Sequence, residues 1–219
     1  MKKSESRSRI SNEKTGFLAV LSAPSGCGKT TILARLLKRH PDWVRSVSVT
    51  TRPPRPEEKN RRDYEFVTPR AFQSLKTKRE FLESARIFGQ YYGTPRKVVE
   101  DSVKAGRTVL LAIDIQGARS VRRLAAKKVP CFSIFVLPPS VSALRERLEK
   151  RHTDSAEEIE KRIERAEEEI KAAREYDATV INRNLDQTAR EIEALISEFA
   201  KQLKGEKRNV LHPARKTHA

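Results

Sequence analysis

The chain has 219 residues, of which 37% are hydrophobic and 34% are charged. This length suits one domain with a substantial core. No apolar run reaches the roughly 18 residues that a transmembrane helix needs. The charged amino end, MKKSESRSRISNEK, lacks the apolar stretch of a signal peptide, so we expect a cytoplasmic protein. The two cysteines, Cys27 and Cys131, cannot form a disulfide framework, and neither has a cysteine or histidine at metal-ligand spacing.

The formal net charge of +17 implies a partner of opposite charge. Residues 1–14 contribute +3 and residues 201–219 contribute +5, so much of the excess lies near the two ends. We expect basic, disordered tails over residues 1–15 and 205–219. The remaining positive charge fits either polyphosphate substrates or nucleic acid. Charge alone does not distinguish these two classes of ligand.

Short apolar runs alternate with helical patterns along the chain. The runs at 17–22, 108–113, 131–137 and 178–182 are typical of buried strands. Helical spacing of apolar residues follows them at 29–40, 116–126, 141–151 and 185–203. This alternation predicts an α/β fold, with a parallel sheet flanked by helices.

Two segments interrupt the alternation and leave 16–46, 95–138 and 176–204 as the predicted core. Residues 47–94 are rich in Thr, Tyr, Phe and Pro, with strand-like pieces such as YEFV at 64–67, and predict an inserted subdomain of mixed structure. Residues 139–175 are dominated by charge. Their narrow apolar stripe, formed by Ile159, Ile163, Ala166 and Ile170, covers little core, so we expect a lid that can move.

The strongest local signal is APSGCGKT at 23–30, between a predicted strand and a predicted helix, which is the context of a P-loop. Backbone N–H groups of such a loop bind phosphate oxygens, and Gly26 and Gly28 let the backbone approach closely. Lys29 reaches the β- and γ-phosphates, and the Thr30 hydroxyl is a ligand for Mg²⁺. We expect Mg²⁺-ATP to contact Ala23, Pro24, Ser25, Gly26, Cys27, Gly28, Lys29, Thr30 and Thr31.

Two positions of this loop carry residues that the motif does not prescribe. Ala23 replaces the first glycine of the motif, and its methyl group is tolerable if the residue keeps a negative φ. Cys27 occupies a variable position and is interpreted as a packing residue rather than a nucleophile.

The segment TRPPR at 51–55 places two guanidinium groups on a stretch stiffened by proline. Arg52 and Arg55 are therefore suited to clamp a monophosphate through bidentate hydrogen bonds. Taken alone, however, two arginines beside prolines are more typical of a basic surface loop.

Several separated motifs between Gly16 and Leu203 together resemble guanylate kinases: SAPSGCGKTT, SVSVTTRPPRPEE with RRDYEFV, EFLESARIFGQYYGT, IDIQGARSV, VLPPS, LRERLEKR and VINRNLD. The resemblance implies a P-loop NTPase fold with an inserted GMP-binding subdomain at 47–94 and a helical lid at 139–175. It also implies ATP-dependent phosphorylation of GMP, and of dGMP, with Mg²⁺ as cofactor.

The resemblance assigns residues to the acceptor. Arg52 and Arg55, with Tyr64 and Tyr92, would hold the GMP phosphate. Glu83 would read guanine, because one carboxylate accepts both the N1–H and the N2 amine, which adenine lacks. Without the resemblance, Glu83 would be a solvated charge in a helical turn. The other base contacts implied are the hydroxyls of Ser48 and Thr94 and the acidic side chain of Asp114.

The resemblance also assigns lid residues. Arg147, Arg151 and Arg162, together with Lys29, would stabilise the transferring phosphoryl group, and Asn182 would lie near the adenine of ATP. By themselves the lid arginines would be ion-pair partners of glutamates such as Glu146, Glu158 and Glu160. One departure concerns Ala112, where guanylate kinases usually carry an acidic residue that makes indirect contacts with Mg²⁺.

Three alternatives compete with a guanylate kinase. A related binding module recognises phosphopeptides without catalysis, but such modules typically lack an intact phosphate loop. A nucleic-acid binder would leave the kinase motifs unused, so we expect nucleic-acid contact only as a secondary property of the tails. A kinase for a ribose phosphate is opposed by Ser48, Glu83 and Thr94. We expect a monomer or a homodimer with no membrane contact.

Overall fold

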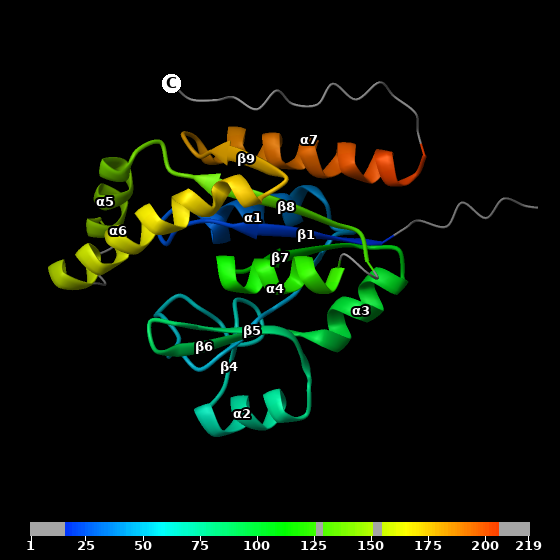
Figure 1. The fold of residues 1–219 in the computed structure, drawn as a ribbon, viewed down its shortest axis with the longest axis horizontal. Helices are drawn as coiled ribbons and strands as arrows, with labels where there is room; N and C mark the ends of the chain where they lie inside the picture. Colours follow the sequence, from blue (N-terminus) through cyan, green and yellow to red (C-terminus); the bar gives the residue numbers. More distant parts are fainter. Residues whose placement is uncertain (1–15, 126–128, 151–154, 206–219) are drawn as a thin grey trace, which may run out of the picture.

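A computed structural model describes residues 16–125, 129–150 and 155–205 (Figure 1). The expected amino-terminal tail, nearly all of the expected carboxyl-terminal tail, and Arg151 lie outside these residues. Among the described residues, no helix is long and apolar enough to cross a membrane.

The central sheet has five strands, all paired in parallel. Their order is β2 (Val44–Arg45), β7 (Thr108–Ala112), β1 (Phe17–Ser22), β8 (Cys131–Leu137) and β9 (Ala178–Ile181). Helices connect these strands, because parallel neighbours cannot be joined by a tight turn. This arrangement confirms the predicted α/β fold with a parallel sheet and flanking helices.

Helices cover both faces of the central sheet (Figure 1). Helices α1 (Lys29–Arg39) and α7 (Leu185–Leu203) pack on one face, and α3 (Arg96–Lys104) and α4 (Ile115–Ala125) on the other. Strand β1 divides its side chains between them, with Leu21 facing α1 and α7 and Val20 facing α3 and α4. Both side chains are fully buried, and such burial contributes about 1.5–3 kcal/mol each to stability. The buried strands therefore fix the positions of the loops that follow them, including the loop between β1 and α1.

A second sheet of four strands lies beside the core (Figure 1). Its order is β4 (Glu65–Phe66), β3 (Val49–Thr50), β6 (Gln90–Pro95) and β5 (Phe81–Ile87), and only β3 and β4 pair in parallel. Helix α2 (Pro69–Thr77) packs on it through Phe72, whose ring centroid is 4.6 Å from that of Phe81. The prediction that Glu83 stands in a helical turn was wrong, because Glu83 lies in β5 and points inward beside Phe81 and Ala85.

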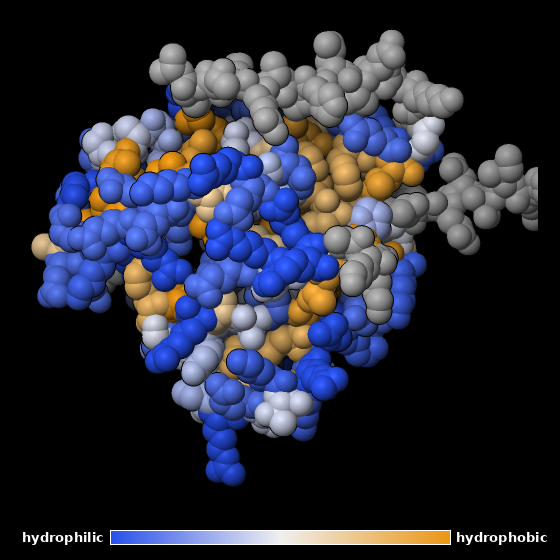
Figure 2. Space-filling model, viewed as in Figure 1, coloured by the Kyte–Doolittle hydropathy of each residue, from blue (hydrophilic) through white to orange (hydrophobic). Residues whose placement is uncertain are grey.

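Helices α5 (Val141–Glu149) and α6 (Ala156–Lys171), followed by the short 3₁₀ helix η1 (Ala172–Glu175), lie at one end of the core. Ser155 and Glu158 form a capping box that begins α6. Three residues of the apolar stripe, Ile159, Ile163 and Ala166, are buried against α5 and the P-loop residue Cys27. The stripe thus has a small core of its own, whereas the outer surface of α6 is largely hydrophilic (Figure 2).

Candidate active site

The loop between β1 and α1 has the backbone shape of a phosphate-binding loop. Gly26 and Gly28 adopt φ values of 93° and 80°, which strain any other residue. A Cβ at Gly26 would lie 2.9 Å from Leu144 Cδ1, and a Cβ at Gly28 would lie 2.9 Å from Leu185 Cδ2. Ala23 is absent from the described non-glycine residues with positive φ, so its methyl group meets the condition set by the sequence.

Asn182 is hydrogen-bonded to the backbone of this loop. Its side-chain amide donates to the Cys27 carbonyl at 2.8 Å, and its amide oxygen accepts a hydrogen bond from the Thr188 hydroxyl at 3.2 Å. Asn182 is 1% exposed and does not line the pocket. The side chain is therefore engaged within the protein, and the expected place of Asn182 near the adenine of ATP stays a prediction.

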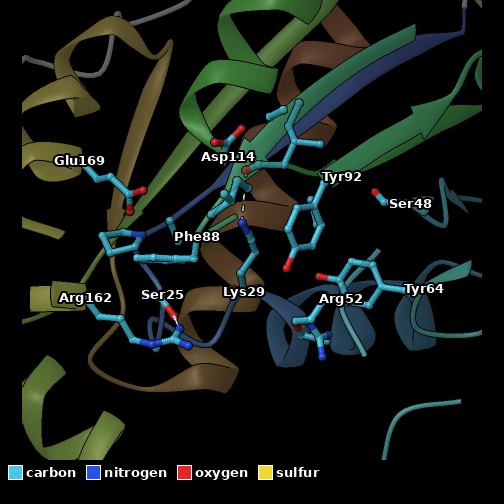
Figure 3. A pocket seen from close by; sticks show the side chains of 18 of the residues that line it. Ser25, Lys29, Ser48, Arg52, Tyr64, Phe88, Tyr92, Asp114, Arg162 and Glu169 are labelled. Carbon is cyan, nitrogen blue, oxygen red and sulfur yellow. Dashed lines mark hydrogen bonds between the residues drawn. The ribbon is translucent and has the colours of Figure 1, made fainter. Parts of the chain in front are cut away.

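Lys29 is the first residue of α1 and points into the pocket from the end of the P-loop (Figure 3). Its ammonium group donates to the Ile113 carbonyl at 3.2 Å. Burial lowers the pKa of Lys29, while the nearby carboxylates of Asp114 and Glu169 act in the opposite direction. A buried ammonium at the amino end of a helix is well placed to attract phosphate.

Arg52 lines the same pocket as Lys29, and several neighbouring groups fix the position of its guanidinium group. Its Nη2 donates to both carboxylate oxygens of Glu58 at 2.8 Å, and its Nη1 donates to the Pro53 carbonyl at 2.6 Å. The guanidinium carbon also lies 5.5 Å from the centroid of the Tyr64 ring. Glu58 in addition accepts the backbone N–H of Arg55 at 2.8 Å. One carboxylate thus fixes the segment that carries both arginines.

Glu83 lies in the second sheet and is only 8% exposed. Its carboxylate accepts a hydrogen bond from the Thr94 hydroxyl at 2.5 Å. Burial raises the pKa of Glu83 to about 7, and the nearby Asp114 adds to the rise. Gly117 packs against this carboxylate, since a Cβ there would lie 2.7 Å from Glu83 Oε2. The second sheet and α4 therefore enclose the Glu83 side chain closely, and its carboxyl group is a weaker acid than that of an exposed glutamate.

Asp114 follows β7 and stands between Glu83 and the lid. Its Oδ1 accepts the backbone N–H of Gly117 at 2.9 Å. Its Oδ2 is buried and has no hydrogen-bond partner among the described residues, although Arg165 Nη2 lies 3.7 Å away. A buried acceptor without a hydrogen bond on the pocket wall indicates a place for a donor from a ligand.

The lid reaches the pocket through one face of α6. Arg162 donates to the Ser25 hydroxyl of the P-loop at 2.8 Å (Figure 3). Arg165 donates to Glu169 at 3.0 Å, and both line the pocket. Arg147 does not line it and donates instead to the Asn182 carbonyl at 3.0 Å. Burial raises the pKa of Glu169, and Arg165 partly opposes this rise.

One pocket joins most of the predicted residues (Figure 3). Its lining includes Ala23, Pro24, Ser25, Gly26, Gly28, Lys29, Thr30 and Thr31 from the phosphate loop and helix α1, and Ser48, Arg52, Arg55, Tyr64, Glu83, Tyr92, Asp114 and Arg162 from elsewhere. Thr94 stands behind Glu83, and Cys27 packs under the lid.

Five further residues of the site were not predicted from the sequence: Glu58, Phe88, Gly117, Arg165 and Glu169. The spacing of Arg162, Arg165 and Glu169 on one helical face was the available signal for the last two. The described residues contain no cluster of three or more His, Cys, Asp or Glu that would hold a metal without a substrate.

The fold and the pocket define a P-loop nucleotide kinase. The guanylate kinase family model matches residues 16–199. Guanylate kinases of Wolbachia sp. subsp. Brugia malayi and Wolbachia pipientis wMel are 48% and 47% identical to the chain, and the matches cover 85% and 86% of this chain and 94% of each relative. The crystal structure of guanylate kinase from Anaplasma phagocytophilum is similar with a TM-score of 0.72 and 35% identity, over 85% of this chain and 87% of that one. The chain therefore belongs to the guanylate kinase family.

Proposed function

We propose that this protein transfers the γ-phosphoryl group of ATP to GMP, and to dGMP, giving ADP and the corresponding diphosphate. The observation that carries the proposal is that Lys29 of the P-loop and Glu83 of the second sheet line the same pocket. The first is suited to a donor phosphate and the second to a guanine base. Family membership supports the same reaction.

The donor binds at the loop between β1 and α1. Backbone N–H groups at the start of α1 and the Lys29 ammonium bind the β- and γ-phosphates. The Thr30 hydroxyl, which lines the pocket next to Lys29, would hold Mg²⁺, a cation that prefers oxygen ligands. When bound, Mg²⁺ neutralises charge on the β- and γ-phosphates. Ala112 supplies no carboxylate, so Asp114, whose Oδ2 has no hydrogen-bond partner among the described residues, would be an acidic side chain available to such a cation.

The acceptor binds between the second sheet and β7. Arg52, Arg55, Tyr64 and Tyr92 hold its phosphate, with Arg52 already oriented by Glu58. Glu83 accepts the N1–H and N2–H hydrogen bonds of guanine, and Thr94 and Gly117 fix the carboxylate for this task. Adenine would place an unprotonated N1 against the carboxylate, leaving buried acceptors unpaired. Ser48 and Asp114 complete the base site.

Catalysis rests on alignment and on charge stabilisation, because phosphoryl transfer needs little covalent help from the protein. The acceptor phosphate lies in line with the γ-phosphate when the second sheet and the lid close on the core. Lys29 and Arg162 then stabilise the charge on the transferring group. Arg147 and Arg151 are proposed to join them on closure. Closure also excludes water and so limits hydrolysis of ATP.

A coupled assay for ADP, with ATP and each of GMP, dGMP, AMP, CMP and UMP, tests this function. Turnover is expected with GMP and dGMP and not with the other nucleotides. No turnover with any monophosphate, together with tight binding of a phosphopeptide or of RNA, would instead indicate a binding protein. The cytoplasmic location, the monomer or homodimer state and any nucleic-acid contact of the tails stay predictions from the sequence.

A further inference from the structure

Phe88 occupies an unusual position at the tip of the hairpin that joins β5 to β6. The hairpin turns through Phe88 and Gly89, whose φ values are 47° and 79°. A turn with two left-handed central residues favours Asn-Gly or Gly-Gly, and a bulky residue there is strained. Phe88 is also 49% exposed, so burial in a core does not explain it. Strained and exposed apolar residues of this kind gather at functional sites.

The ring of Phe88 contacts the lid. Its centroid lies 5.3 Å from the guanidinium carbon of Arg162 and 4.8 Å from that of Arg165, both within the range of cation–π attraction. Phe88 lines the pocket, and Figure 3 draws it on the same side of the pocket as Arg162. The tip of the acceptor sheet thus meets the lid through one aromatic ring.

The two arginines connect this ring to the rest of the pocket. Arg162 donates to Ser25 of the P-loop, and Arg165 pairs with Glu169 and lies 3.7 Å from Asp114. Phe88 itself belongs to the hairpin that begins with β5, the strand that carries Glu83. The ring thus connects the strand that carries Glu83 with the lid arginine Arg162.

We propose that Phe88 is a positioning residue for phosphoryl transfer: its ring seats Arg162 and Arg165 over the P-loop when the acceptor sheet meets the lid. The inference rests on the proposed GMP kinase function and adds to it a link between acceptor binding and placement of the lid arginines. A residue without an aromatic ring at this position would not make the cation–π contacts with the two arginines.

Four variants at this position distinguish the effect of the aromatic ring from the effect of the strained backbone. Phe88→Asn favours the left-handed backbone but removes the ring. Phe88→Leu keeps an apolar side chain without a π face, and Phe88→Tyr and Phe88→Trp keep a ring. The matched control is Leu124→Asn on α4, where an equally exposed apolar residue (48%) lies outside the pocket.

We expect kcat with GMP to fall about tenfold to a hundredfold in Phe88→Asn and Phe88→Leu, because a misplaced catalytic arginine aligns the reaction poorly. KM for GMP should change less than about threefold, since Phe88 is not assigned to the base or the phosphate. Tyr and Trp should restore most of kcat. The melting temperature of Phe88→Asn should stay within about 2 °C of wild type, because relief of backbone strain offsets the lost ring contacts.

A double-mutant cycle with Arg162→Gln tests the route of the effect. If Phe88 acts through Arg162, adding Phe88→Asn to Arg162→Gln should lower kcat little further. Additive losses, wild-type kcat in Phe88→Asn, or equal losses in Phe88→Tyr and Phe88→Asn would overturn the inference. Wild-type turnover of GMP tests the proposed function separately, so a fully active wild type with unaffected Phe88 variants would reject only the role of Phe88.

Discussion

The hydroxyl of Thr94 donates to the carboxylate of Glu83 at 2.5 Å inside the second sheet, on the wall of the pocket. This bond stabilises the ionised carboxylate, yet burial dominates and raises the pKa of Glu83 to about 7. The proposed guanine-reading group is therefore expected to be partly protonated near neutral pH in the absence of substrate.

The first prediction follows from this pKa. Guanine offers two donors, so it binds the ionised carboxylate, and a protonated Glu83 must first lose its proton. Below pH 7, kcat/KM for GMP should fall by about tenfold per pH unit, and above about pH 8 it should level off. Steady-state kinetics between about pH 5.5 and 9 measure this profile.

The phosphate of GMP also titrates, near pH 6, so the pH profile needs a control that separates the two groups. Glu83→Gln retains the titration of the phosphate and lacks that of residue 83. Parallel profiles for wild type and Glu83→Gln would show that Glu83 does not titrate in the binding step.

The second prediction concerns guanine specificity. Glu83→Gln keeps the size of the side chain but presents an amide donor toward a guanine N–H. We expect kcat/KM for GMP to fall by about a hundredfold to a thousandfold, or about 3–4 kcal/mol, and that for AMP to change little. The exposed Glu80→Gln, in the same segment, is the matched control. Equal proportional losses for GMP and AMP would indicate that Glu83 supports the fold instead of reading the base.

The third prediction uses the close packing of Gly117. Gly117→Ala places a methyl group 2.7 Å from Glu83 Oε2, so the carboxylate must shift. KM for GMP should rise about tenfold while KM for ATP changes little, because the methyl group lies closest to Glu83 and is farther, at 3.3 Å, from Asp114 Oδ1. Gln116→Ala on the exposed side of α4 is the control. An unchanged KM for GMP in Gly117→Ala would mean that the contact does not constrain the base site.

The fourth prediction concerns the donor site. Lys29→Ala removes the buried ammonium next to the P-loop and should lower kcat by about a hundredfold to ten-thousandfold. Lys38→Ala, an exposed lysine on the same helix, should retain wild-type kcat. Wild-type turnover in Lys29→Ala would contradict the assignment of the phosphate loop.

The fifth prediction addresses Asp114, whose Oδ2 has no hydrogen-bond partner among the described residues. Asp114→Asn should raise KM for GMP and also the Mg²⁺ concentration needed for half-maximal rate, since the substitution removes a charge near both sites. Rate is titrated against Mg²⁺ at saturating GMP. An unchanged Mg²⁺ titration would restrict Asp114 to the base site.

The core strands and the phosphate loop were predictable from local sequence patterns. Strands such as 17–22 and 131–137 match the structure because apolar runs between helical patterns are local signals. The P-loop was equally local, since its glycines, Lys29 and the flanking elements lie within a few residues of one another. For Arg52 and Glu83 the residues alone favoured a surface loop and a surface charge, and only the resemblance to guanylate kinases indicated a site.

Other features of the site depend on contacts between segments far apart in the chain and were not predictable from local patterns. Glu83 interrupts the apolar alternation of its strand, so local pattern misassigned it, and only pairing of β5 with β6 turns it inward. The apolar stripe of α6 is buried against Leu144 and Leu148 of α5 and against Cys27, which lies more than 100 residues earlier in the chain. Phe88 likewise contacts Arg165, which lies 77 residues later in the chain. The periodicity of apolar residues indicates which face of a helix or strand is buried. It does not indicate which element packs against that face, because this depends on the packing of the whole chain.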